Sequence, residues 1–204
     1  MKAAVLFSGG KDSALAALLL SRDYDVELNT FVFDPGRDRA AVIRAAEALC
    51  LPLQVRTFRP DLLAEVTGMI EKQGFPNDAI NHVHREAITI LAGEYGVVGD
   101  GIRFNDRVPM LSRGEVQHLE STCGCSYVRP LLGFGKPEIQ RLAGRYLDVR
   151  YGETGEIDNG DYESEIRQAL AGRGLDPASY FPPGHQQSLV IGRVNIRQNG
   201  DNNE

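Results

Sequence analysis

The sequence predicts a doubly wound α/β fold, in which helices cover both faces of a parallel β-sheet. Short apolar runs alternate with helical segments four times over the first half of the chain, and a pair of glycines separates the first run from the first helix. Repeated strand–helix–strand steps require parallel strands joined by right-handed crossovers. The chain has 204 residues, which is enough for one sizeable domain and too short for two catalytic domains.

The elements of the first half follow from local patterns. Residues 3–7 form an apolar run that Gly9 and Gly10 end, which predicts a short buried strand. The Ala- and Leu-rich residues 12–21 predict a buried helix, because apolar side chains surround it on nearly all sides. The same reasoning predicts strands at residues 26–33, 53–58 and 97–98, and helices at residues 37–50, 60–73 and 77–95, the last with Gly96 as its C-cap.

The second half is less regular. Residues 105–127 are expected to hold two turns and a pair of cysteines. Residues 150–162 carry three glycines, so they form either an active-site loop or lid, or a plain surface loop. The other expected elements are helices at residues 137–146 and 163–172, a strand pair at residues 188–196, and a frayed polar tail at residues 198–204.

We assign residues 1–150 to one α/β domain. Residues 151–204 are then a small C-terminal extension with a short helix and terminal strands.

Composition limits the partners and the location. The 28 Asp and Glu outnumber the 22 Lys and Arg, which argues against a surface that attracts nucleic acid as a whole. Residues 101–150 reverse this balance, with eight Lys or Arg against five Asp or Glu, so a local basic zone remains available. Three cysteines, no secretion signal and no apolar run of about 18 residues predict a cytoplasmic protein without a membrane partner.

Residues 8–13, which we call the glycine loop, are the most informative stretch. They follow the first strand and open the first helix, where an open parallel sheet binds its ligands. Glycines let backbone N–H groups approach an anion, and the helix dipole adds to the attraction. Lysine and serine side chains supply further donors, so the loop suits a polyphosphate. Its residues are Ser8, Gly9, Gly10, Lys11, Asp12 and Ser13.

Two common phosphate-binding motifs are excluded by their spacing. The Walker motif requires a glycine five residues before Gly10, and this chain has Val5 there. The Gly-x-Gly-x-x-Gly motif of dinucleotide-binding proteins is also absent.

The glycine loop resembles the signature of the PP-loop ATP pyrophosphatases, a family within the HUP-like, Rossmann-like folds. The resemblance covers roughly residues 1–147. It implies that the protein binds Mg-ATP, cleaves it between the α and β phosphates, adenylates a carbonyl oxygen and releases pyrophosphate. A nitrogen or sulfur nucleophile then displaces AMP. The nucleotide-binding residues that the resemblance implies are those of the glycine loop together with Phe33, Gly99 and Arg103.

The same resemblance suggests residues for Mg²⁺ and for the phosphates. Asp100 and Asp106 are candidate ligands for Mg²⁺, although either can instead be a turn residue in a glycine-rich loop. Lys136 lies in a segment similar to the Pro-Leu and Lys-x-Glu-Ile element of the family, in which the lysine reaches the phosphates. Lys11, Asp12 and Lys136 are therefore the candidate catalytic residues at the phosphate end.

Cys123 and Cys125 raise the question of sulfur chemistry. Two thiols in a glycine turn can carry a persulfide to an adenylated base and then close as a disulfide, can bind a metal, or can be inert; we include both as catalytic candidates. Cys50 is expected in the core beside the helix that ends there. His82 and His84 lie on different faces of a helix, so one buried and one exposed histidine are expected.

The resemblance, together with these residues, implies an ATP-dependent adenylating enzyme with ATP and Mg²⁺ as cofactors, and the leading hypothesis is that it modifies a tRNA base. The alternatives are an amide-forming ligase acting on a small carbonyl substrate and a non-catalytic nucleotide-binding sensor subunit. The sensor is disfavoured because binding of AMP alone needs no pyrophosphate site. A protein that donates sulfur or ammonia is a candidate partner, and a homodimer remains open.

Overall fold

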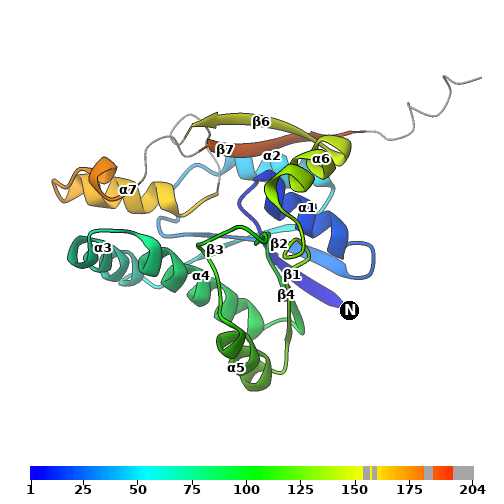
Figure 1. Cartoon of the computed structure of the whole chain (residues 1–204), viewed down its shortest axis with the longest axis horizontal. Helices are drawn as coiled ribbons and strands as arrows, with labels where there is room; N and C mark the ends of the chain where they lie inside the picture. Colours follow the sequence, from blue (N-terminus) through cyan, green and yellow to red (C-terminus); the bar gives the residue numbers. More distant parts are fainter. Residues whose placement is uncertain (154–156, 158–159, 182–185, 195–204) are drawn as a thin grey trace, which may run out of the picture.

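The computed structural model describes residues 1–153, 157, 160–181 and 186–194, and it confirms the doubly wound α/β fold (Figure 1). Five parallel strands form a sheet in the order β3-β2-β1-β4-β5. From β1 the chain first adds β2 and β3 on one side and then β4 and β5 on the other side. The strand order therefore reverses between β1 and β4, and ligand binding is expected at the carboxyl ends of these two strands. The strands are β1 (Lys2–Leu6), β2 (Asp25–Val32), β3 (Leu53–Thr57), β4 (Val97–Gly99) and β5 (Ser126–Val128).

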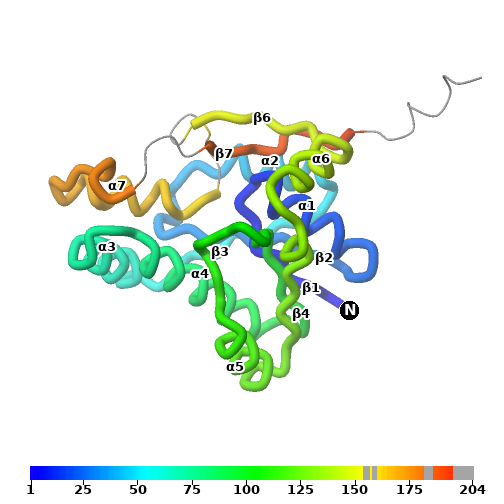
Figure 2. The backbone as a smooth tube through the Cα atoms, viewed as in Figure 1, coloured from blue at the N-terminus to red at the C-terminus, as the bar shows by residue number. Residues whose placement is uncertain are grey.

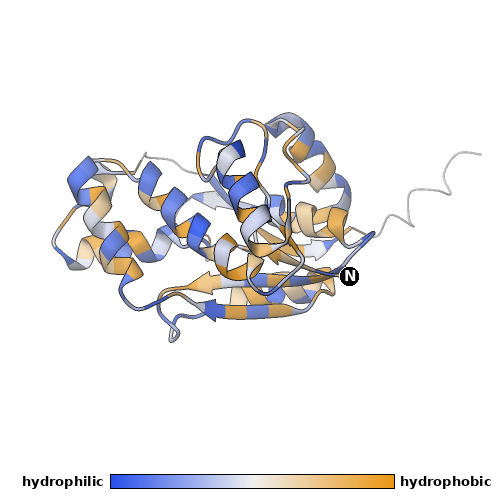
Figure 3. Ribbon diagram, turned by 90° about the horizontal axis from the view of Figure 1, so that it is seen from below, coloured by the Kyte–Doolittle hydropathy of each residue, from blue (hydrophilic) through white to orange (hydrophobic). Residues whose placement is uncertain are grey.

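Helices pack on both faces of the sheet, and each face has its own hydrophobic core. Side chains alternate along β1, so that Ala3 and Val5 enter one core and Ala4 and Leu6 enter the other. Figure 3 shows helices with hydrophobic residues on one side and hydrophilic residues on the other, as this packing requires. One face carries α1 (Lys11–Leu20), α2 (Ala40–Leu49) and α6 (Lys136–Tyr146); the other carries α3 (Leu62–Gln73), α4 (Asn77–Ala92), α5 (Arg113–Cys123) and α7 (Glu163–Gly172).

A second sheet brings the end of the described chain back to its beginning. It consists of β6 (Leu147–Glu153) and β7 (Gln186–Arg193), paired antiparallel. Figure 2 shows β7 beside α2, and Val190 of β7 enters the same core as α1 and α2. Residues on both sides of position 150 therefore share a core, and the domain boundary proposed there falls inside β6.

Several elements differ from the sequence-based expectations. Residues 105–127 contain α5 and β5 rather than turns alone, and α4 ends at Ala92 with Gly93 as its C-cap rather than at Gly96. Part of residues 150–162 belongs to β6 rather than to a loop. Cys50 is exposed and adopts a left-handed backbone conformation (φ 54°) after α2, so it is not a core residue.

Two further expectations extend beyond the described residues. The polar tail at residues 198–204 and the end of the strand pair at residues 195–196 lie outside them. Within the described part of the chain, no helix has the length and apolar character that crossing a membrane requires.

Candidate functional site

A cavity of ≈ 590 Å³ opens at the carboxyl ends of β1 and β4. It is lined by the glycine loop, by the segment after β4, by α4 and α6, and by residues that precede α7 and begin β7. Most of the implied polar site residues meet here: Ser8, Gly10, Lys11, Asp12, Ser13, Asp100, Arg103, Asp106 and Lys136 all line it.

The glycine loop is held in shape by its own hydrogen bonds. Gly9 has a φ of 80°, a conformation that side-chain-bearing residues rarely adopt. The Ser8 N–H donates to Ser13 Oγ (3.3 Å), and Ser13 Oγ donates to the Gly10 carbonyl (3.1 Å). Lys11 then begins α1, so the N–H groups that have no partner within this helix lie at its start, beside the cavity.

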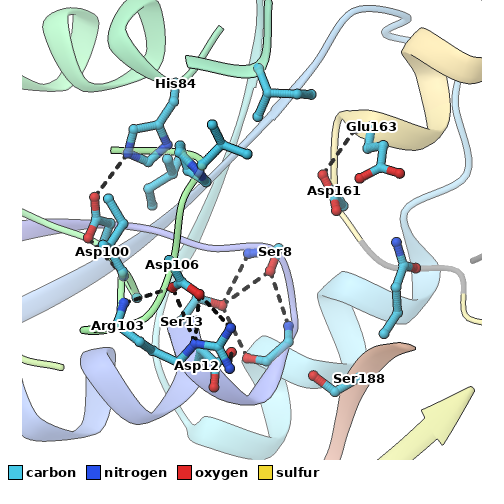
Figure 4. A pocket seen from close by; sticks show the side chains of 18 of the residues that line it. Ser8, Asp12, Ser13, His84, Asp100, Arg103, Asp106, Asp161, Glu163 and Ser188 are labelled. Atoms are coloured by element: carbon cyan, nitrogen blue, oxygen red, sulfur yellow. Dashed lines mark hydrogen bonds and ion pairs between the residues drawn. The ribbon is translucent and has the colours of Figure 1, made fainter. Parts of the chain in front are cut away.

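Positive charge collects beside the loop and is balanced by two aspartates (Figure 4). Lys11 Nζ lies 3.0 Å from Asp12 Oδ2, and Arg103 Nη1 lies 3.5 Å from the same oxygen. Arg103 also forms a bidentate pair with Asp106, and this hydrogen bonding raises the pKa of the guanidinium. The side chain of Lys136 reaches the cavity wall from the first residue of α6. An anion that enters the cavity meets three basic side chains, two of which are paired with aspartates.

The opposite end of the cavity holds a buried chain of hydrogen bonds. His84 Nε2 donates to Asp100 Oδ2 (3.0 Å), because an ionised carboxylate can only accept. His84 Nδ1 then accepts from the Tyr162 hydroxyl (3.0 Å). The Tyr127 hydroxyl donates to the same Asp100 oxygen, and the Ile102 N–H donates to Asp100 Oδ1 (3.1 Å). Both oxygens of Asp100 are therefore engaged within the protein.

Burial makes this hydrogen-bonded chain rigid and keeps its phenols protonated. His84 and Asp100 are each only 2% exposed. Burial, reinforced by the negative charge of Asp100, raises the pKa of Tyr127, and burial likewise raises the pKa of Tyr162. An aspartate that fixes a histidine tautomer, with a hydroxyl on the other ring nitrogen, is an arrangement that can relay a proton.

The two ends are joined by a close backbone approach. A Cβ on Gly101 would lie 2.6 Å from the Ser13 nitrogen and 2.7 Å from the Asp12 carbonyl carbon. Only glycine lets the segment after β4 pack directly on the start of α1. This contact sets the distance between Asp100 and the glycine loop.

Phe33 does not line the cavity, and its backbone has another partner. Its N–H donates to Glu165 Oε2 (3.0 Å), and the Asp34 N–H donates to Glu165 Oε1 (2.9 Å). Glu165 is only 6% exposed and comes from α7. The chain itself therefore occupies the backbone at the end of β2, where the family resemblance implied that Phe33 binds the nucleotide.

Gly99 and the two cysteines also lie away from the cavity. Gly99 is a buried residue of β4, and a Cβ added to it would lie 2.6 Å from Leu20 Cδ1 and 3.3 Å from the Val128 carbonyl oxygen. Cys125 precedes the amino end of β5, whereas the cavity lies at the carboxyl ends of the parallel strands. Burial raises the pKa of the Cys125 thiol, which is the opposite of activation. The structure therefore does not bring Cys123 and Cys125 together with the glycine loop.

Several cavity residues were not identified from the sequence. His84 comes from α4 and Tyr162 is the residue just before α7, so the two are far apart in the chain. The one available signal for His84 was its place on the buried face of α4. Tyr151 and Glu163 carried no local motif and also line the cavity.

Fold and site together define an α/β protein with a glycine loop and a polar cavity at the point where the strand order of its doubly wound sheet reverses. The chain belongs to DUF7411, a family of unknown function, whose model matches residues 1–192.

Similar proteins come from Methanocaldococcus jannaschii. An uncharacterised protein of this organism is 38% identical over 189 residues, which is 92% of this chain and 94% of that protein. The crystal structure of a predicted subunit of a tRNA methyltransferase from M. jannaschii aligns with a TM-score of 0.87 and 36% identity. It covers 96% of this chain and 99% of that chain, so the fold is shared over nearly the whole length.

Proposed function

We propose that the protein is an ATP pyrophosphatase that adenylates a carbonyl oxygen. The carbonyl oxygen attacks the α-phosphorus, the bond from that phosphorus to the bridging oxygen of the β-phosphate breaks, and pyrophosphate leaves. The observation that carries this proposal is the presence of Lys11 and Arg103 at the glycine loop, with Lys136 on the wall of the same cavity. The departing pyrophosphate gains negative charge, and fixed cations stabilise that charge in the transition state.

The donor set of the site fits Mg²⁺ bound together with phosphates. Among the described residues, no cluster of three or more His, Cys, Asp and Glu can hold a metal by itself. Mg²⁺ commonly uses one or two carboxylates plus substrate phosphates, and Asp12 and Asp106 are carboxylates on the cavity wall near the loop. When bound, the ion would neutralise charge on the phosphates. Asp100 fits an orienting role better, since its oxygens already serve His84, Tyr127 and Ile102.

The other end of the cavity suits the acceptor. With pyrophosphate at the loop, the α-phosphate and the carbonyl carbon lie toward His84 and Tyr162. There the Asp100–His84–Tyr162 chain can take the proton that a nitrogen or sulfur nucleophile releases when it attacks. Because Cys123 and Cys125 lie elsewhere, we propose that this nucleophile comes from solution or from a partner protein.

A tRNA base is the acceptor that we favour over a small molecule. The similar M. jannaschii structure is that of a predicted subunit of a tRNA methyltransferase. Residues 101–150 carry more Lys and Arg than Asp and Glu. This stretch includes α6 and the segment that comes after β4, and both border the cavity. A local basic zone suits a phosphodiester backbone even in a chain of net charge −6.

Product analysis tests the proposal. Purified protein is incubated with Mg-ATP and either bulk tRNA or candidate small carbonyl compounds, and the nucleotides are separated by chromatography. AMP and pyrophosphate that form only with an acceptor support the proposal. ADP and inorganic phosphate as the products would overturn it.

A further inference from the structure

β7 lies directly against the glycine loop, although about 175 residues separate them in the sequence. The Val190 N–H donates to the Gly9 carbonyl (2.9 Å), and the Lys11 N–H donates to Ser188 Oγ (3.2 Å). A Cβ on Gly10 would lie 3.4 Å from the Ser188 carbonyl oxygen. A Cβ on Gly9 would lie 3.2 Å from Leu189 Cδ1, so β7 packs closely on the loop and forms a wall of this end of the cavity.

Gln187 is the unusual residue of this wall. It lines the cavity, its side chain is only 6% exposed, and its Nε2 has no hydrogen-bond partner among the described residues. Buried amide groups are almost always paired, because an unpaired one costs about 1–3 kcal/mol. An orphan donor on the wall of an anion-binding cavity is explained if a ligand supplies its acceptor.

Ser188 has the same capacity. Its Oγ accepts the hydrogen bond from the Lys11 N–H, so its own hydroxyl hydrogen is free to donate. Figure 4 shows Ser188 beside the glycine loop, across from Ser8. The wall thus carries two neutral donor groups beside the loop: the Ser188 hydroxyl, and the Gln187 amide, whose Nε2 is buried here and reaches a ligand when its side chain turns toward the cavity.

We propose that β7 is a ligand-binding strand, in which the Gln187 amide and the Ser188 hydroxyl donate hydrogen bonds to a polyphosphate held by the glycine loop. This inference rests on the proposed function and adds a second side to its phosphate site. The C-terminal segment is then part of the binding site, because the loop alone supplies only one side of it.

The test is titration calorimetry of the full chain with inorganic pyrophosphate and with ATP. Gln187→Met keeps the length of the side chain and removes the donor, so it should weaken pyrophosphate binding about 10-fold or more. Its melting temperature should not fall, because the substitution removes a buried unpaired amide and leaves no other group without a partner. Gln168→Met makes the same chemical change at an exposed position of α7 outside the cavity, and it should bind as the unmodified protein does.

The outcomes separate this inference from the proposed function. Unchanged pyrophosphate affinity in Gln187→Met, with tight binding by the unmodified protein, would overturn the role of β7 and leave the proposed function standing. If the unmodified protein binds neither ATP nor pyrophosphate, both fall.

A second measurement avoids the variant altogether. In ¹⁵N-labelled unmodified protein, the side-chain amide resonance of Gln187 should shift when pyrophosphate saturates the site, since its hydrogens gain an acceptor. A Gln187 resonance that stays in place at saturation contradicts the inference, even where Gln187→Met fails to fold.

Discussion

At the scale of single residues, the cavity separates two kinds of chemistry. Lys11 and Arg103 place charge at the glycine loop, Lys136 adds a basic side chain to the cavity wall, and the other end holds the buried Asp100–His84–Tyr162 chain. Such a division suits a reaction in which one fragment leaves as a polyanion while a proton moves elsewhere.

The lysine of the loop gives the first prediction. Lys11→Ala removes charge that a polyphosphate needs, while Arg103 still pairs with Asp12. Pyrophosphate affinity measured by calorimetry should fall at least about 10-fold, with a change in melting temperature of no more than about 2–4 °C. Lys72→Ala, at an exposed position of α3, is the matched control and should change neither quantity. Full affinity in Lys11→Ala would remove the loop from the site.

Tyr127 gives a prediction about alkaline pH. Burial and the charge of Asp100 raise its pKa above the ordinary value of 10.0, so the folded state favours the neutral phenol. The stabilisation that it contributes is complete below pH 10 and is lost as the pH rises above that value. In urea unfolding at pH 8 and pH 10.5, Tyr127→Phe should lose less stability between the two pH values than the unmodified protein does.

The same substitution should also cost about 1–3 kcal/mol at pH 8, because Asp100 loses a donor. Tyr24→Phe, just after α1 and away from this network, serves as the control and should keep the pH dependence of the unmodified protein. Equal losses between pH 8 and pH 10.5 in Tyr127→Phe and the unmodified protein would contradict the assigned cause of the pKa shift.

Residues of the site differ in how far the sequence could reveal them. The glycine loop is six consecutive residues with one physical purpose, so its pattern can be recognised locally. The contact between His84 and Tyr162 joins residues 78 apart, and nothing in either neighbourhood indicates the other. Cys123 and Cys125 form a conspicuous pair in the sequence, but only the direction of β5 shows that they lie at the wrong end of the sheet.

At the scale of elements, the strands and helices up to β4 match the expectations because each has a clear period and a glycine or proline boundary. α5 was not predicted because it buries a single residue, Leu119, and so lacks an apolar stripe. Its start does carry a local signal, a capping box of Ser112 and Glu115, that could have identified it. β6 is mostly exposed, and its pairing with β7 depends on a distant partner.

α7 gives the element-scale prediction. Glu165→Gln replaces a carboxylate that accepts from the backbone of Phe33 and Asp34, and an amide nitrogen cannot accept. The free energy of unfolding should fall by about 1.5–3 kcal/mol in urea titrations. Glu138→Gln, which disturbs only an exposed pair with Arg141 on α6, should cost no more than about 0.5 kcal/mol. Equal effects of the two variants would show that α7 is not anchored through Glu165.

At the scale of the whole molecule, the chain folds back so that its described end completes the site near its beginning. β7 packs on α2 and bonds to the glycine loop, and the Gly160 N–H donates to the Ser8 carbonyl (2.8 Å). We therefore expect the segment after residue 150 to be needed for ligand binding. No local pattern indicates this arrangement, because it depends on contacts between distant segments.

We propose that the glycine loop holds the β and γ phosphates of ATP, with the α-phosphate directed toward His84. A crystal structure with the α,β-methylene analogue of ATP, whose α–β bond the proposed reaction cannot break, tests this arrangement most directly. We expect the β and γ phosphates within hydrogen-bond distance of the loop and of Lys11, and the α-phosphorus on the side of His84 and Tyr162. An analogue bound with its phosphates away from residues 8–13, or with its γ-phosphate toward His84, would contradict it.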